Sequence, residues 1–195
     1  MFSRWRKRYP VVTLETERFR LETMQPLAFA RISLPWTDDP EIMNALSLPA
    51  GGWTLRRWWR RMRQYRRKKA IGLVIWTKED RKPIGFQFAS ITGTNGAIIG
   101  IVIGDREWWG RDVVIETRRT FIDYLFDDIG VNRIGGFPTV RNFPSVYNYQ
   151  RLGFVLEDTL RRYISDGQGG LTDCFAFGIL REEWDAQRKA GVKET

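Results

Sequence analysis

The chain has 195 residues, 43% of them apolar, which predicts a single domain over residues 1–195 whose first 11 residues form a basic extension. Its 32 basic and 23 acidic side chains give a formal charge of +9, which favours an acidic partner such as nucleic acid, an anionic membrane or an acidic carrier protein. The sequence contains no histidine, which excludes Ser-His and Cys-His nucleophiles and most catalytic zinc sites, so no metal is expected. A lone Cys174 excludes an intrachain disulfide, and with no signal-peptide or membrane-length apolar run a soluble, cytoplasmic protein is expected.

The N-terminal part predicts a strand followed by short helices. Apolar residues alternate over 12–23, with an interruption at Glu15–Glu17, and this pattern predicts the opening strand of a sheet. Short helices are expected over Leu27–Ser33 and Asp39–Leu46. A turn at Pro49–Gly52 separates them from the next helix.

A strongly basic helix is predicted from Thr54. Thr54 can cap this helix, and Trp53 can pack against Trp58 four positions into it. The apolar and aromatic side chains that fall on one face are Leu55, Trp58, Trp59, Met62 and Tyr65. The same segment carries nine positive charges in fourteen residues, with no acid among them: Arg56, Arg57, Arg60, Arg61, Arg63, Arg66, Arg67, Lys68 and Lys69.

The basic helix has more than one interpretation. A charge run is usually a solvated helix face, although Arg56 and Arg57 occupy the first turn, where the helix dipole disfavours cations. Arginines beside Trp58, Trp59 and Tyr65 can also grip phosphates and stack on bases, or lie on anionic lipid. The aromatic side chains can equally form a buried stripe. The partners expected at this helix are tRNA or another RNA, or an acyl carrier protein.

The rest of the chain predicts a meander, a crossover and two closing strands. Strands over Ile71–Trp76, Pro83–Ile91 and Ala97–Gly104 are expected to form an antiparallel meander. A helix over Arg111–Ile129, with Val114, Phe121, Leu125 and Ile129 buried and Gly130 at its end, connects the third strand to the next. The later elements are a strand over Asn132–Pro138, a helix over Asn142–Leu152, and strands over Gly153–Ser165 and Leu171–Leu180. The fold class is mixed α/β (α+β).

Three segments resemble a known family. The block from Asp105 to Phe154, GDREWWGRD and NRIGGFPTVRNFPSVYNYQRLGF, resembles the core of the GNAT superfamily of N-acetyltransferases. Thr16–Leu21 resembles the opening strand of the ribosomal-protein N-acetyltransferase branch, and Asp173–Trp184 resembles its ending. The resemblance implies a GNAT-like fold: a mostly antiparallel sheet with splayed central strands and flanking helices.

The resemblance also implies where an acyl donor, acetyl-coenzyme A by default, would bind. The donor arm would lie between the splayed strands, along Ile101, Val102 and Ile103, and an unpaired strand N–H would stabilise the thioester oxygen. The pyrophosphate would bind at the start of the following helix, at Gly110, Arg111, Val113 and Val114. Asn142 matches the family asparagine that contacts the donor arm, and it can also cap its helix.

The pyrophosphate loop departs from the family pattern at two small positions. Related loops read WGKGYGTEA, whereas this chain has Asp112 and Val114 at the two small positions. A β-branched side chain there should crowd a phosphate, and a carboxylate should repel it or itself accept hydrogen bonds from the first-turn N–H groups. Alternatively Asp112 is only a good helix start, and Arg111, Arg118 and Arg119 can offset its charge. Weakened affinity for coenzyme A is expected.

One catalytic side chain is implied by the match. Tyr149 falls where many members carry the tyrosine that protonates the departing thiolate, although it can also simply pack beside the sheet. The base is not specified, because Ile98 stands where relatives have an acid. The remaining acids are Asp105 and Glu116, expected to support a turn and a helix, and Glu107.

Three functions follow, in order of preference. The first is an N-acyltransferase that moves an acetyl group from acetyl-coenzyme A to a primary amine, as a monomer or homodimer. A charged tRNA or an acyl carrier protein can replace that donor. The third is a non-catalytic module that binds nucleic acid or another acidic partner through the basic helix. The acceptor pocket is expected from Leu27–Gly52 and Asp166–Gly170.

Overall fold

One eight-stranded sheet organises the molecule, and only one neighbouring pair of its strands is parallel. The computed structural model describes residues 11–66, 69–93 and 95–191, so the basic extension, apart from Val11, lies outside the described residues. The strands, in sheet order, are β1 (Thr13–Glu15), β2 (Phe19–Thr23), β3 (Ala70–Thr77), β4 (Pro83–Ile91), β5 (Gly96–Ile103), β6 (Arg133–Gly136), β8 (Leu171–Leu180) and β7 (Val155–Ser165). Only β5 and β6 run parallel. The meander is confirmed, while the opening strand is two strands, because the chain turns between Glu15 and Phe19.

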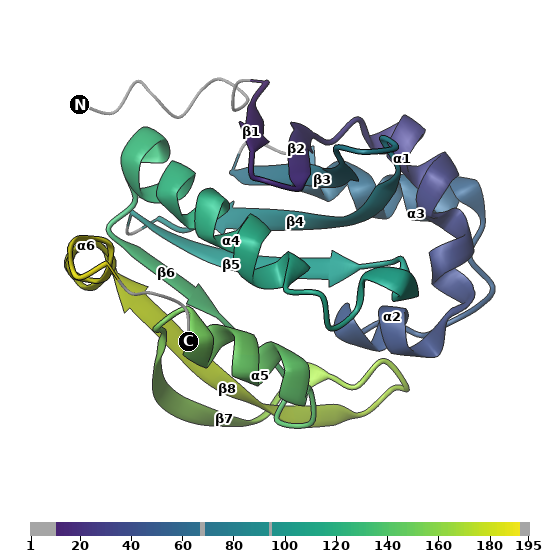
Figure 1. Ribbon diagram of the computed structural model, residues 1–195. Helices are drawn as coiled ribbons and strands as arrows, with labels where there is room; N and C mark the ends of the chain where they lie inside the picture. Colours follow the sequence, from purple (N-terminus) through teal and green to yellow (C-terminus); the bar gives the residue numbers. More distant parts are fainter. Residues whose placement is uncertain (1–10, 67–68, 94, 192–195) are drawn as a thin grey trace.

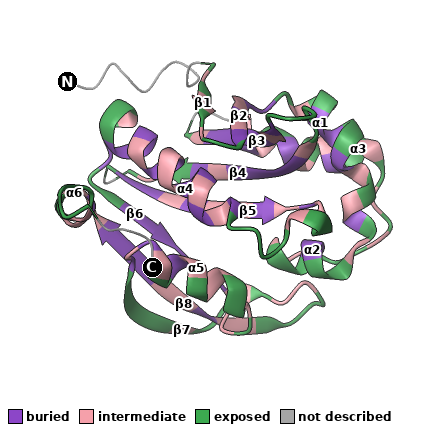
Figure 2. Cartoon of the chain, in the orientation of Figure 1, coloured by how far each residue is buried: buried purple, intermediate pink, exposed green. Residues whose placement is uncertain are grey.

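Helices cover the sheet on both faces (Figure 1). One face carries α1 (Pro26–Ser33), α2 (Pro40–Ala45) and α3 (Leu55–Met62), and the other carries α4 (Val113–Tyr124) and α5 (Phe143–Arg151). Shorter 3-10 segments span Leu34–Asp38, Arg63–Arg66 and Arg106–Trp108, and a π turn spans Leu125–Ile129. Figure 2 shows that the central strands of the sheet are largely buried, whereas β7, at one edge, is exposed. Within the described residues, none of the helices has the length and apolar character to cross a bilayer.

Helix α3 forms as predicted. The Thr54 hydroxyl accepts a hydrogen bond from the N–H of Arg57, and the rings of Trp53 and Trp58 meet edge to face at 5.4 Å. Trp58 is 1% exposed and its indole donates to the Ser33 hydroxyl at 2.8 Å. The buried-stripe interpretation is therefore confirmed for Trp58, and also for Tyr65, which is 4% exposed.

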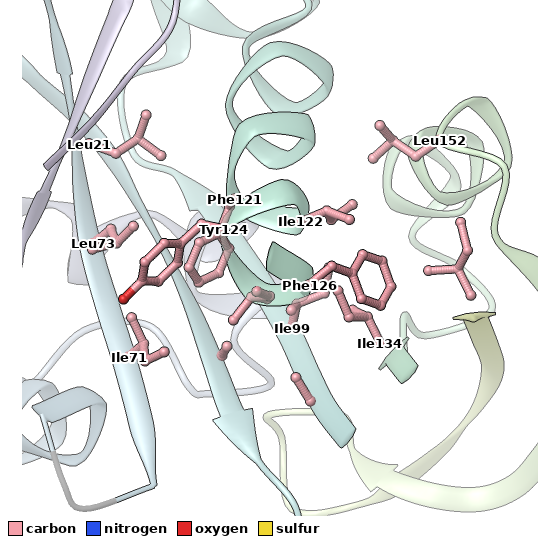
Figure 3. Packing of buried hydrophobic residues seen from close by; sticks show 14 of the residues in the cluster. Leu21, Ile71, Leu73, Ile99, Phe121, Ile122, Tyr124, Phe126, Ile134 and Leu152 are labelled. Carbon is pink, nitrogen blue, oxygen red and sulfur yellow. The ribbon is translucent and has the colours of Figure 1, made fainter. Parts of the chain in front are cut away.

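Helix α4 packs its apolar side against β2–β6 (Figure 3). Phe121 and Tyr124 point from α4 toward Leu73 of β3, whereas Ile122 points to the side where Leu152 lies. The predicted end at Gly130 is confirmed, since this glycine caps the π turn with a φ of +79°. This packing fixes α4 over the junction of β5 and β6.

The parallel pair β5–β6 separates soon after it begins. Register is kept only from Gly96–Arg133 to Ile98–Gly135, after which β5 continues paired with β4 alone, while β6 ends at Gly136. Strand β6 is thus shorter than predicted, and Pro138 beyond it lacks an N–H for a ladder. The expected splay of the central strands is confirmed.

Helix α6 (Arg181–Lys189) was not predicted from the sequence. The Glu183 carboxylate accepts a hydrogen bond from the N–H of Leu180 and so caps its start. Trp184 is 3% exposed, and its indole donates to Asp123 at 2.7 Å. Helix α6 therefore anchors the C-terminal segment to the end of α4.

Candidate active site

The Tyr149 hydroxyl lies where β5 and β6 separate. Tyr149 projects from α5, is 2% exposed, and donates to the carbonyl oxygen of Ile99 at 3.2 Å. The end of β6 must be glycine for this, because a Cβ on Gly136 would come within 1.9 Å of the hydroxyl oxygen. The ring also stacks on Phe177 of β8, with centroids 5.2 Å apart. The position of Tyr149 at the splay is thus a finding of the structure, while its catalytic role stays a prediction.

Beyond the splay, the backbone of β5 presents alternate residues to the opening. Antiparallel pairing with β4 uses every second residue, and the carbonyls of Ile99 and Ile103 point away from β4. The Ile103 carbonyl accepts the Trp109 indole at 3.0 Å. By the same alternation Ile101, midway between them, turns its N–H and C=O toward the opening, while the Val102 side chain is buried on the opposite face.

A buried arginine, which the sequence analysis did not place here, lies against Tyr149. Arg118 of α4 is 2% exposed, and its guanidinium carbon is 4.6 Å from the centroid of the Tyr149 ring. Its Nη1 has no hydrogen-bond partner among the described residues. The expectation that Arg118 offsets charge at the pyrophosphate loop is wrong, because the side chain points into the core.

A signal for this arginine was present in the sequence. Arg118 stands four residues after Val114 and three before Phe121, on the apolar stripe that was predicted to be buried. A charged residue at that spacing is either buried with the apolar residues around it or interrupts the buried face of the helix. The structure shows that Arg118 is buried.

Burial and mutual contact perturb the acid–base behaviour of this pair. Burial raises the pKa of the Tyr149 phenol, and the neighbouring Arg118 charge partly opposes that rise. Burial likewise lowers the pKa of Arg118, against the opposing effect of Tyr149. Titratable groups with perturbed pKa values that lie in an opening of the fold are typical of functional sites.

The first turn of α4 differs from its expected chemistry. Gly110 and Asp112 both have positive φ, +72° and +56°, which explains why small residues suit this loop. The prediction that the Asp112 carboxylate accepts hydrogen bonds from first-turn N–H groups is wrong: it makes no cap and instead pairs with Arg151 of α5. Left-handed backbone turns the side chain outward, so the helix start stays uncapped by it. Val113 is buried and Val114 half-buried.

A hollow of about 710 Å³ adjoins this helix start. Its lining includes three arginines, Arg18, Arg111 and Arg119, and three acids, Glu17, Asp112 and Glu116. At the other predicted donor contact, the Asn142 side chain accepts a hydrogen bond from the N–H of Ser145 at 3.1 Å. The capping role of Asn142 is confirmed.

The three candidate acids are each engaged in an ion pair with a basic side chain. Asp105 caps the Arg106–Trp108 turn and binds Lys82 at 2.7 Å, as expected of a turn residue. Glu116 accepts hydrogen bonds from the Thr16 hydroxyl at 2.6 Å and from Arg18, as expected of a helix support. Glu107 is exposed beside Lys82.

The predicted acceptor segments meet each other. A Cβ on Gly167, in the β7–β8 turn, would come within 3.0 Å of the Leu48 backbone.

A cavity of about 260 Å³ lies on the sheet face opposite Tyr149, lined by Ile98, Gly135 and the Arg133–Glu157 ion pair. Sequence reasoning did not anticipate this cavity.

The arginines of α3 and Arg63 just after it form a separate surface, here called the α3 arginine surface, whose described members are exposed except for the half-buried Arg61. Its described members Arg56, Arg57, Arg60, Arg61 and Arg63 make no ion pair with a carboxylate in residues 11–66, 69–93 and 95–191. Two of them lie over indole rings, Arg57 on Trp53 at 4.2 Å and Arg63 on Trp59 at 5.0 Å. Of the other predicted members, Arg66 is half-buried, and Arg67 lies outside the described residues. With Trp58 and Tyr65 buried, base stacking on those two rings is excluded.

Comparison with known proteins agrees with this geometry. The family model described as acetyltransferase (GNAT) domain matches residues 18–155. A protein of Bacillus licheniformis named uncharacterized N-acetyltransferase p20 is 31% identical over 179 residues, which cover 88% of this chain and 98% of that protein. Ribosomal-protein-S5-alanine acetyltransferase from Vibrio fischeri superimposes with a TM-score of 0.75 at 21% identity, over 89% of this chain and 98% of that one. RimJ from Mycobacterium smegmatis, solved with CoA-disulfide, gives 0.72 at 20% identity, over 93% and 94%. The chain therefore belongs to the GNAT family of acetyltransferases.

Proposed function

We propose that this protein transfers an acetyl group from acetyl-coenzyme A to a primary amine, with Tyr149 as the general acid. The observation that carries the proposal is the Tyr149 hydroxyl at the separation of β5 and β6, hydrogen-bonded to Ile99 and next to the edge of β5 that, among the described residues, no strand pairs beyond Ile98. A proton donor and an unpaired N–H at one opening are the two groups that acyl transfer needs.

The residues present fit the donor. The N–H of Ile101 faces the opening, the first turn of α4 carries no side-chain cap from Asp112, and arginines line the adjacent hollow. The orphan Nη1 of Arg118 adds an unsatisfied donor close to Tyr149. The donor supplies an activated acyl thioester, and the Asp112 carboxylate is the feature that opposes its pyrophosphate.

The protein's own groups then divide the chemistry. The Ile101 N–H stabilises negative charge on the carbonyl oxygen, and Tyr149 delivers its proton to the departing sulfur. Because Asp105 and Glu116 are engaged in ion pairs, neither serves as the base, and the acceptor amine reaches the site already neutral. The acceptor approaches through Leu27–Gly52 and Asp166–Gly170, which meet at Leu48 and Gly167.

Calorimetric titration with acetyl-coenzyme A, together with a thiol-release assay on small amines, tests the proposal. We expect binding, transfer, and a fall of about 100-fold in kcat for Tyr149→Phe with acetyl-coenzyme A affinity retained. An Asp112→Gly/Val114→Gly variant should bind the donor more tightly. Binding only by that double variant, or transfer unaffected by Tyr149→Phe, would argue against the proposal and favour a charged tRNA or an acyl carrier protein as donor.

A second proposal concerns the α3 arginine surface, which we propose docks a substrate carried on RNA. Its support is a set of arginines, exposed except for the half-buried Arg61, that have no carboxylate partner among the described residues, because the guanidinium fork matches phosphate oxygens. Two arginines stand in the first turn of α3, where they weaken the helix, which favours a role outside helix stability. A ribosomal substrate, as named for the Vibrio fischeri neighbour, would suit this surface.

Fluorescence anisotropy with a structured RNA, over a series of salt concentrations, tests this surface. We expect affinity that falls steeply with salt and an increase in transfer when the amine is presented on RNA. Salt-independent binding, or binding equal to that of an uncharged polymer, would contradict RNA docking.

A further inference from the structure

Among the described residues, the Arg118 charge has no carboxylate counterion. Its side chain is 2% exposed, and it forms no ion pair in the part of the chain that the structure describes. Nη1 lacks a hydrogen-bond partner there, and the group that acts on the guanidinium is Tyr149, through a side-chain hydrogen bond and through its ring, whose centroid is 4.6 Å from the guanidinium carbon. Burying a guanidinium without an anion costs free energy. A negative charge on a neighbouring group would reduce this cost, and the neighbouring group that can ionise is the Tyr149 phenol.

The nearby carboxylates of α4 are all committed elsewhere. Asp112 pairs with Arg151, Glu116 binds Arg18, and Asp123 accepts from Trp184 and from Arg188 of α6. On α5, β5 and β8, which pack around Tyr149, the described residues contribute no other charge that acts on the phenol. The electrostatics of Tyr149 therefore rest on Arg118.

Packing alone gives no reason for this residue. The site is on the apolar stripe of α4, among Phe121 and Ile122, where methionine or leucine would fill the volume without a desolvated charge. Buried charges kept at such a cost are typical of functional sites. The chain thus tolerates a destabilising group beside its proton donor.

We propose that Arg118 is a positioning residue that stabilises the phenolate form of Tyr149 and so makes Tyr149 an effective proton donor. The catalytic part of this inference rests on the proposed function. When Tyr149 gives its proton to the departing sulfur, the O–H bond breaks and an S–H bond forms, and the phenolate holds the negative charge beside the guanidinium. The phenolate then regains a proton from solvent, to which the acylated amine nitrogen has lost one.

The direct test measures the ionisation of Tyr149 without any donor. Replacing Tyr149 with a difluorotyrosine lowers the pH at which the phenol ionises and keeps the titration within the range where the fold is stable. The phenol absorbance is followed with pH in this protein, in the same protein with Arg118→Met or Arg118→Lys, and with the control Arg188→Met. Arg188 of α6 pairs with Asp127, and it is not among the groups that act on the Tyr149 phenol.

We expect Arg118→Met to move the phenol titration to higher pH, Arg118→Lys to move it less, and Arg188→Met to leave it in place. The Met variant should also lose about tenfold or more in kcat, with folding stability equal or higher, since a buried charge is replaced by an apolar chain. A titration that Arg118→Met leaves unmoved would overturn the inference, whatever happens to activity. A shifted titration in a protein that transfers no acyl group would instead count against the proposed function alone.

Discussion

Helices α3 and α4 make the same contact in opposite surroundings. On α3, Arg57 and Arg63 lie over indole rings at 4.2 and 5.0 Å, and both side chains face solvent. On α4, Arg118 lies over the Tyr149 ring at 4.6 Å and is 2% exposed. Water screens the α3 charges and leaves them available to a partner, whereas the buried charge acts at full strength on one neighbour. Solvent around a guanidinium therefore decides its role more than the ring beneath it does.

The largest effect should come from reversing the two kinds of charge. Arg118→Glu places an unpaired carboxylate in the core and should lower the free energy of unfolding by about 3 kcal/mol or more. Arg60→Glu on exposed α3 should change it by less than about 0.5 kcal/mol. Chemical denaturation of both variants measures the difference. Equal losses would erase the contrast between the helices.

Moving the phenol away from Arg118 sharpens the comparison. Gly136→Ala brings a methyl group into the Tyr149 hydroxyl, so we expect a loss of about 2 kcal/mol in stability and a fall in kcat. The matched control is Gly93→Ala, whose Cβ would meet open space. Thermal unfolding and a transfer assay report the two effects. A Gly136→Ala enzyme as active as Gly93→Ala would show that the hydroxyl position is not needed.

The exposed side of the comparison is tested by charge reversal on α3. Arg56→Glu/Arg60→Glu should weaken RNA binding by about tenfold or more and reduce its salt dependence, while transfer to a small free amine stays unchanged. Arg161→Glu/Lys189→Glu makes the same change in net charge at other exposed positions and serves as control. Equal weakening by both pairs would point to net charge rather than to the α3 arginine surface.

Glu116 supplies a half-buried ion pair between the two extremes. Burial alone would raise the pKa of Glu116, but hydrogen bonds from Thr16 and Arg18 outweigh it and hold the pKa below its ordinary value of 4.5. A lowered folded-state pKa stabilises the fold above pH 4.5, and this contribution is lost as pH falls through the lower folded value. Glu116→Gln should thus cost about 1 kcal/mol at neutral pH and little in acid, as denaturation at several pH values would show. A difference that persists unchanged in acid would refute the ion-pair account.

The smallest expected effect concerns Asp112. Asp112→Gly relieves a positive φ of +56° and removes an exposed ion pair with Arg151, two opposite effects that should nearly cancel to within about 0.5 kcal/mol. Donor affinity should rise all the same. Asp112→Asn removes the charge and keeps the side chain, so it separates repulsion from backbone freedom: if only the glycine variant binds more tightly, charge is not the obstacle.

Local patterns predicted most of the fold. Capping by Thr54, the Trp53–Trp58 contact and the end of α4 at Gly130 follow from neighbouring residues, and the structure confirms them. Tyr149 was singled out by resemblance, its position at the splay is a finding of the structure, and its role remains a prediction. The cap by Asp112 was predicted wrongly because backbone handedness, which sets the side-chain direction, is not visible in the residue type.

Long-range contacts account for what the sequence analysis missed. Arg118 of α4 contacts Tyr149 of α5, and the residues next to each of them in the sequence do not indicate this contact. Helix α6 depends on Trp184 reaching Asp123, far away in the chain. Such partners become apparent only when the topology brings α4, α5 and α6 together.

Because β5 and β6 pair over only a short length, the sheet has a weakly hydrogen-bonded boundary between them, here called the seam. Three residue pairs join the meander side of the sheet to the β6–β8–β7 side, so the cohesion between them comes mainly from α4 and the apolar layer beneath it. An acyl donor lying in the opening would contact both sides and connect them across the seam. Donor binding would then make the whole sheet more rigid, which slower amide hydrogen exchange in β6 would report.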